Sequence, residues 1–196
     1  IRSYRIQDTK TKNIHMKKKI LFAITSFFVT ASASAQNYIT KNGKISFFSK
    51  TNIENIDAVN NQAVSVITQT GSVAFSVLVN GFLFKKALMQ EHFNENYMES
   101  GKYPKASFKG AITDMSKDDF KKDGSYIVTV TGDLNMHHIT NKVTVPAVIV
   151  VKGNTISANA SFKIKLDDYK IAVPRVVENN ISKTIDLKVD CNYETR

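Results

Sequence analysis

The chain has 196 residues, of which 42% are hydrophobic and 22% charged, and this length suits one domain with a core of its own. Its single cysteine, Cys191, excludes an intrachain disulfide and is expected to be a small buried hydrophobe. Lys and Arg outnumber Asp and Glu by 27 to 17, so the formal net charge is +10.

An export signal is predicted over residues 16–35. Met16 is followed by three lysines, and Ile20–Thr30 then forms an uninterrupted run of mostly apolar side chains. Ala33-Ser34-Ala35 matches the small-x-small pattern that signal peptidase cleaves. The apolar run is shorter than the roughly 20 residues that a membrane-spanning helix needs. The sequence therefore predicts a periplasmic or secreted protein with no transmembrane segment after signal removal.

The mature protein is predicted to be a single domain over residues 36–196, and residues 1–15 are interpreted as an upstream extension. Removing residues 1–35 takes away seven Lys and Arg and one Asp, which leaves 20 basic and 16 acidic side chains. The net charge of the mature domain is then +4. A charge this small argues against nucleic acid as a partner.

Strand patterns dominate the mature chain. Three strands are expected before its one helix: Lys44–Lys50, Ala58–Thr70 and Ser72–Phe84. Asn42-Gly43 predicts a turn just before the first of them, and Asn80-Gly81 predicts a bulge or tight bend inside the last.

The one helical candidate is Lys85–Pro104. Residues at four-residue spacing give it an apolar stripe: Met89, Phe93 and Tyr97. The helix is expected to start near Ala87, because Lys85 and Lys86 are unfavourable at the positive end of the helix dipole. Gly101 and Pro104 are expected to end it. Such a helix would either plug a barrel end or form a lid over a cavity.

Alternation becomes regular after the helix. Five further strands are expected, around residues 106–110, 126–134, 143–151, 162–166 and 184–193. Seven or eight strands with one polar and one apolar face predict an antiparallel sandwich or barrel. Lys163, Lys165 and Lys188 on the polar face argue against contact with lipid, so a barrel with an apolar interior is favoured.

Candidate catalytic or metal-binding groups are few. His92, His137 and His138 are the only histidines of the mature domain, and the adjacent pair is expected in a solvated turn. Neighbouring strand residues point to opposite faces, so the pair is not expected to hold a metal. No nucleophile motif or phosphate-binding loop is present. The sequence predicts a protein without enzymatic activity or cofactor, and a hydrolase or metal enzyme would require His137 or His138 to converge with a carboxylate.

Three segments together resemble a known family: HFNENYMESGKYPKASFKG (His92–Gly110), GDLNMHHITNKVTVP (Gly132–Pro146) and FKIKLDDYKI (Phe162–Ile171). In this order they are similar to the YceI-like proteins, an exported, lipocalin-like family associated with polyisoprenoid binding. The likeness extends over residues 38–194. The chain departs from the family at His138, where glycine is common, and the mature domain has no Trp.

The resemblance implies an all-β fold: an eight-stranded antiparallel lipocalin-like β-barrel with one short amphipathic helix near the barrel end. Candidate residues lining a tunnel, and so contacting a ligand, are Phe47, Phe75, Val77, Phe82, Phe84, Met89, Phe93, Tyr97, Phe108, Phe162 and Ile164. Polar groups at the cavity mouth are expected to be His92, Asn94 and Asn96.

The implied function is to hold a polyisoprenoid or similar long apolar chain in the barrel interior, for carriage or storage in the cell envelope. Alternation cannot distinguish a hollow barrel from a filled one. A packed barrel with a structural or interaction role and no lipid ligand therefore stays open, and so does a homodimer.

Overall fold

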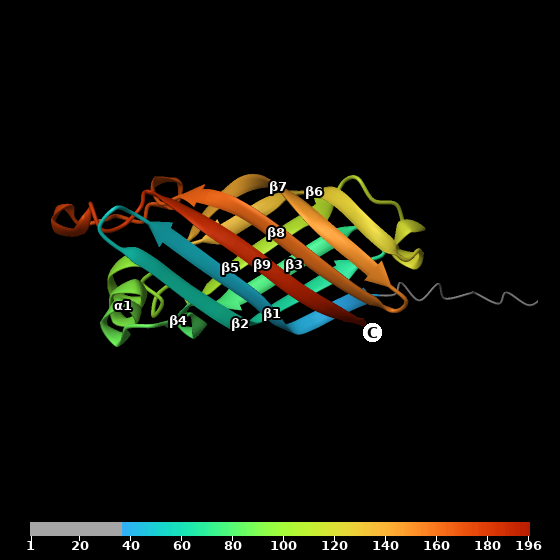
Figure 1. The fold of residues 1–196 in the computed structure, drawn as a ribbon, viewed down its shortest axis with the longest axis horizontal. Helices are drawn as coiled ribbons and strands as arrows, with labels where there is room; N and C mark the ends of the chain where they lie inside the picture. The colour runs from blue at the N-terminus through green and yellow to red at the C-terminus, as the bar shows by residue number, and fades with distance from the viewer. Residues whose placement is uncertain (1–36) are drawn as a thin grey trace, which may run out of the picture. The chain divides into compact units, whose positions relative to one another are not determined.

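The computed structural model describes residues 37–196, so the predicted signal peptide and the extension before it lie outside the described residues. Eight antiparallel strands form the wall of a barrel: β1 (Asn37–Lys50), β2 (Asn55–Thr68), β3 (Ser72–Leu78), β5 (Lys105–Ile112), β6 (Gly124–Met136), β7 (Ile139–Lys152), β8 (Thr155–Lys165) and β9 (Thr184–Thr195). Around the wall the order is β1, β9, β8, β7, β6, β5, β3 and β2, and pairing of β1 with β2 closes it (Figure 1). The predicted eight-stranded barrel is confirmed.

The alternating pattern places apolar side chains inside. In β7, for example, Val145, Ala147, Ile149 and Val151 are buried, whereas Val148 and Val150 between them are exposed on the outer surface. Pairing fixes this arrangement, because a slip of one residue would turn every apolar side chain outward.

A bulge replaces the turn predicted at Asn42-Gly43. β1 runs through both residues, and its register with β2 shifts on either side of Gly43. A Cβ atom at Gly43 would lie 2.7 Å from Sγ of Cys191 on the neighbouring β9, so a larger residue would collide with that sulfur. The Asn-Gly pair therefore marks a place where a strand bends against its neighbour, not a connection between strands.

The helix begins at Ala87, as predicted, but ends earlier than Gly101. A regular helix, α1 (Ala87–His92), passes into a π-helical turn, η2 (Phe93–Tyr97). The N–H of Met98 donates to the carbonyl oxygen of Phe93 at 2.9 Å. Glu99 then adopts a left-handed φ of 44°, and this residue supplies the stop that the sequence pattern assigns to glycine.

The two ends of the barrel differ. At one end the 3₁₀ turn η3 (Asp119–Lys121) inserts Phe120, which is buried and stacks on Tyr38 with ring centroids 5.9 Å apart. The Tyr38 hydroxyl donates to the carbonyl oxygen of Phe120 at 3.2 Å. The opposite end carries α1 and the following short elements: η1 (Val79–Gly81), β4 (Leu83–Phe84), η4 (Asp167–Tyr169) and η5 (Arg175–Val177) (Figure 1). Every helix among residues 37–196 is too short or too polar to cross a lipid bilayer.

Candidate functional site: an apolar cavity inside the barrel

The barrel interior is hollow beyond the end that Phe120 fills. A cavity of about 520 Å³ lies there, and each of the eight wall strands contributes residues to its lining. The volume falls in the range of pockets that hold one small ligand. Space remains because several inward positions carry minimal side chains, among them Ala106, Ala158 and Ala160.

A pair of glycines makes room for Phe108, an aromatic residue of the cavity lining. Gly110 of β5 and Gly132 of β6 are direct partners in the sheet. A Cβ atom added at Gly110 or Gly132 would lie 2.6 or 2.7 Å from Cζ of Phe108, so the Phe108 ring lies across the space that two side chains would otherwise fill. The glycines thus let this ring rest against the wall.

An aromatic cluster holds the helix against the barrel. Phe93 stacks on Phe47 with centroids 5.4 Å apart and also contacts Phe82 at 5.7 Å and Phe84 at 5.0 Å. Phe47 in turn contacts Phe82 at 5.5 Å and Phe84 at 5.6 Å. Phe93 comes from η2 and Phe47 from β1, so the ring contacts of this cluster attach the helical segment to the wall.

The structure brings the predicted apolar residues together. All eleven border the cavity: Phe47, Phe75, Val77, Phe82, Phe84, Met89, Phe93, Tyr97, Phe108, Phe162 and Ile164. The stripe of the helical segment therefore faces inward, and burial raises the pKa of its Tyr97. Contact between these side chains and a ligand stays a prediction.

The mouth of the cavity lies beside the start of the helix. Among the described lining residues only three are exposed, namely Lys86, Leu88 and His92. Glu54 and Asn180 border the same opening. Nζ of Lys86 lies 2.9 Å from Oε1 of Glu54, and this contact lowers the pKa of Glu54, with a smaller contribution from a hydrogen bond to Asn180.

Only one of the three predicted mouth residues reaches the cavity. His92 borders it, whereas Asn94 and Asn96 do not. Asn94 is half-buried, its Nδ2 donates to the carbonyl oxygen of Gln90 at 2.8 Å, and its Oδ1 is buried without a hydrogen-bond partner. Asn96 is exposed. Both asparagines belong to the π-helical turn, whose inward face is formed by Phe93 and Tyr97.

Sequence reasoning missed Glu54 and Lys86. A signal was present: two lysines just before a helix N-terminus conflict with the helix dipole and need another explanation. The structure supplies it, because Lys85 pairs with Asp57 at 2.9 Å and Lys86 with Glu54, both reaching back to β2 and the loop before it.

Inward polar groups near the closed end are paired with each other. The Tyr193 hydroxyl donates to Oγ of Ser65 at 2.9 Å, and Ser65 donates to the carbonyl oxygen of Ala74 at 2.9 Å. Both residues border the cavity. Burial raises the pKa of Tyr193, so its hydroxyl is neutral and the interior carries no charge there.

The predicted solvated turn at the adjacent histidines is wrong for His137. This side chain is buried, with Nδ1 3.0 Å from the carbonyl oxygen of Tyr169 and Nε2 3.0 Å from Oε2 of Glu99. A histidine and a carboxylate therefore do converge, but neither borders the cavity. Residues 37–196 contain no group of three or more His, Cys, Asp or Glu side chains placed to hold a metal ion.

Solved structures share the fold at low sequence identity. A polyisoprenoid binding domain from Saccharophagus degradans, implicated in plant cell wall breakdown, has a TM-score of 0.72 and 14% identity, over 83% of this chain and 99% of that one. BcnA from Burkholderia cenocepacia has a TM-score of 0.61 and 16% identity, over 77% and 95% of the two chains. The Campylobacter jejuni YCEI protein has a TM-score of 0.54 and 15% identity, over 100% and 99%.

Comparison of the sequence with families of known proteins gives a specific match. None of the curated proteins matches the chain. The model of the YceI-like domain matches residues 8–193, which include the whole barrel up to the final residues of β9. The chain therefore belongs to the YceI-like domain family.

Proposed function

We propose that this protein holds one long apolar chain, such as a polyisoprenoid, inside its barrel and carries or stores it in the cell envelope. The observation that carries the proposal is the continuous apolar cavity, which reaches exposed residues only beside Lys86, Leu88 and His92 within the described chain. The polyisoprenoid binding domain with the same fold supports the choice of ligand class.

The chemistry of the lining fits a ligand without internal polar groups. A hydrocarbon chain gains about 2.5 kcal/mol for each 100 Å² of apolar surface that leaves water. A hydrocarbon chain forms no hydrogen bonds, and the inward hydroxyls of Tyr193 and Ser65 are already hydrogen-bonded to each other. A polar ligand would have to desolvate its own groups against an interior that offers few partners. We infer binding and not catalysis for the same reason.

Export is part of the proposal and rests on residues 16–35, which lie outside the described residues. We expect the protein recovered from cells to begin at Gln36, because Ala33-Ser34-Ala35 is the predicted cleavage site. N-terminal sequencing of protein from the periplasmic or culture fraction checks this. Recovery of protein that still begins at Met16 would contradict it.

The binding proposal is tested by mass spectrometry of organic extracts from protein purified without detergent. We expect a long-chain apolar lipid in amounts comparable to the protein. The Phe75→Trp variant should fold but recover less lipid, because the larger ring fills cavity space. The matched control is Ile127→Trp, since Ile127 is exposed on the outer face of β6.

The rival function, a packed structural or interaction barrel, predicts a different pair of results. Lipid would be absent from every extract, and Phe75→Trp would lower the free energy of unfolding by overpacking the interior. That combination would reject the lipid-binding proposal.

A further inference from the structure

Large apolar side chains stand exposed around the cavity mouth. The exposed fractions are 64% for Ile53, 62% for Leu88 and 91% for Val176. They come from three separate segments: the β1–β2 loop, α1 and η5. All three segments lie at the same end of the barrel (Figure 1).

One of these side chains lines the cavity, and the other two neighbour lining residues in sequence. Leu88 itself lines the cavity, Ile53 precedes the lining residue Glu54, and Val176 precedes the lining residue Val177. The exposed apolar groups are therefore arranged around the entrance. We name Ile53, Leu88 and Val176 the mouth rim.

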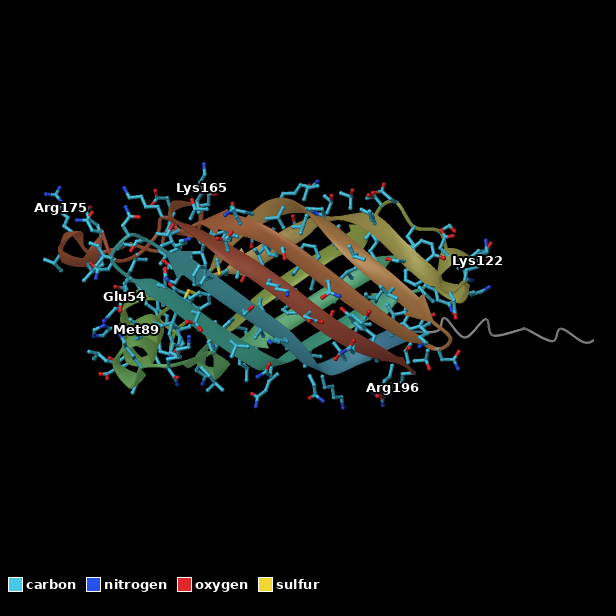
Figure 2. The ribbon with its side chains drawn as sticks, in the orientation of Figure 1. Glu54, Met89, Lys122, Lys165, Arg175 and Arg196 are labelled. Atoms are coloured by element: carbon cyan, nitrogen blue, oxygen red, sulfur yellow. The ribbon has the colours of Figure 1, made fainter. Side chains whose placement is uncertain are left out.

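Polar contacts hold the mouth rim together. Glu54 bonds to Lys86 at the start of the helix and to Asn180 in the segment after η5. One carboxylate thus joins the three segments that carry the rim. Glu54 and Met89 lie at this end of the barrel, and Arg175 extends from its tip (Figure 2).

The charges beside the mouth rim suit an anionic surface. Lys50, Arg175 and Lys183 are exposed, and among the described residues none of the three forms an ion pair. The same segments also expose the carboxylates of Glu91 and Glu178, so these unpaired side chains are three cations and two anions. Arg175 immediately precedes the most exposed apolar residue, Val176. Apolar tips with neighbouring Lys or Arg are the combination that inserts into the interface of a membrane with anionic lipids.

We propose that the mouth rim docks on an anionic lipid bilayer, with Ile53, Leu88 and Val176 inserted among the head groups. The role of this docking rests on the proposed function, because an apolar chain bound in the cavity has its source in a membrane. With the rim inserted, the mouth faces the acyl chains, and a lipid tail enters the barrel without crossing water. A protein partner seated on the same rim would instead close the entrance.

The absence of Trp from the chain gives the docking a direct test. A Val176→Trp variant carries one fluorophore at the rim, and Ile127→Trp carries one at an equally exposed site on the outer wall, where Ile127 is 83% exposed. On addition of phosphatidylcholine vesicles containing phosphatidylglycerol, the emission of Val176→Trp should shift to the blue and that of Ile127→Trp should stay unchanged. Equal shifts, or none for Val176→Trp, would overturn the proposal.

Flotation of the otherwise unchanged protein with the same vesicles gives a second measurement. We expect the triple variant Ile53→Ser, Leu88→Ser, Val176→Ser to bind at least about tenfold more weakly than wild type, and Ile127→Ser to bind within about twofold of it. Added salt should weaken binding, because the cations beside the rim contribute.

Light scattering without vesicles is the third measurement. A dimer that dissociates only in the triple variant would assign the rim to a second copy and overturn membrane docking.

The two proposals can fail separately. Vesicle binding by protein whose extracts hold no lipid would keep docking and reject the lipid-binding function. If the extracts hold lipid but the protein does not bind vesicles, the lipid-binding function is kept and membrane docking is rejected. Circular dichroism of each variant confirms that a loss of binding reflects the rim and not the fold.

Discussion

Nε2 of His137 lies 3.0 Å from Oε2 of Glu99, which joins the β6–β7 turn to the end of the helical segment. Nδ1 of the same ring faces the carbonyl oxygen of Tyr169, which can only accept a hydrogen bond. Nδ1 therefore carries the hydrogen of this contact and donates it to Tyr169. His137 thereby links the segment after η2 to η4 at the end of the barrel that holds the cavity mouth.

Loss of the His137 side chain should weaken this link. His137 and His138 both have left-handed φ values, 49° and 59°, so asparagine suits either backbone position. We expect His137→Asn to lower the free energy of unfolding by about 2 kcal/mol, because the Tyr169 carbonyl loses its buried donor. His138→Asn is the matched control and should cost under about 0.5 kcal/mol, since His138 is exposed. Urea unfolding measures both, and equal losses would show that the side-chain contacts of His137 contribute nothing.

The Gly110–Gly132 pair should tolerate no side chain. A Cβ atom at Gly132 would lie 2.7 Å from Cζ of Phe108 and closer still to the β5 backbone. We expect Gly132→Ala to lower the free energy of unfolding by about 2 kcal/mol and to reduce lipid recovery, because the Phe108 ring is displaced toward the cavity. Gly101→Ala is the control, since a Cβ atom there meets nothing within 4 Å. Unchanged stability and lipid content in Gly132→Ala would contradict the close approach.

Cys191 should make the protein less stable in alkaline solution. Burial raises the pKa of this thiol from 9.0 to about 11. The unfolded chain therefore loses the thiol proton near pH 9, whereas the folded protein keeps it, and stability is complete below pH 9 and falls as the pH rises toward 11. The slope from one such group is at most about 1.4 kcal/mol per pH unit. Urea unfolding of wild type and Cys191→Ala between pH 8 and pH 10 isolates the effect, and parallel pH profiles would refute it.

Glu54 should reduce local opening of the segment around the cavity mouth without affecting the stability of the barrel strands. The contacts with Lys86 and Asn180 hold the pKa of Glu54 below its ordinary value. We expect Glu54→Gln to raise amide hydrogen exchange in residues 175–182, because the charge-assisted bond to the rim is lost. Exchange in the barrel strands should stay as in wild type. Asp57→Gln, which removes the exposed pair with Lys85, is the control and should leave residues 175–182 unaffected. Faster exchange in both variants, or in neither, would contradict the role of Glu54.

Much of the fold follows from local pattern. Alternation in segments such as Val143–Val151 identifies a strand and its inward face, because the side-chain period of a strand matches it. The start at Ala87 follows from the helix dipole, which disfavours Lys85 and Lys86 inside the first turn. Strand alternation and the four-residue spacing of the helix predict which apolar side chains face inward, and the eleven candidates so chosen border the cavity, although the hollow interior itself is implied only by the family resemblance.

The remaining features depend on partners distant in sequence. Whether the barrel is hollow depends on which small residues face one another, as Gly110 and Gly132 do across two strands. Asn42-Gly43 is a hairpin signal locally, but in the structure it forms a bulge in β1, and Gly43 lies against Cys191 of another strand. His137 is buried because Tyr169 and Glu99 reach it from separate segments. No window of sequence contains these partners together.

The last strand, β9, closes the barrel, and this determines when the apolar interior is covered during folding. β9 lies farthest along the chain of the eight barrel strands, yet it pairs with β1, which lies first, and with β8. Until β9 has been synthesised and has found β1, both neighbours have an open edge and the interior is a bare apolar sheet face in water. Pairings this distant form late in folding. We therefore expect the proposed lipid uptake to require the finished barrel, because an unpaired β9 leaves the apolar inner face in contact with water.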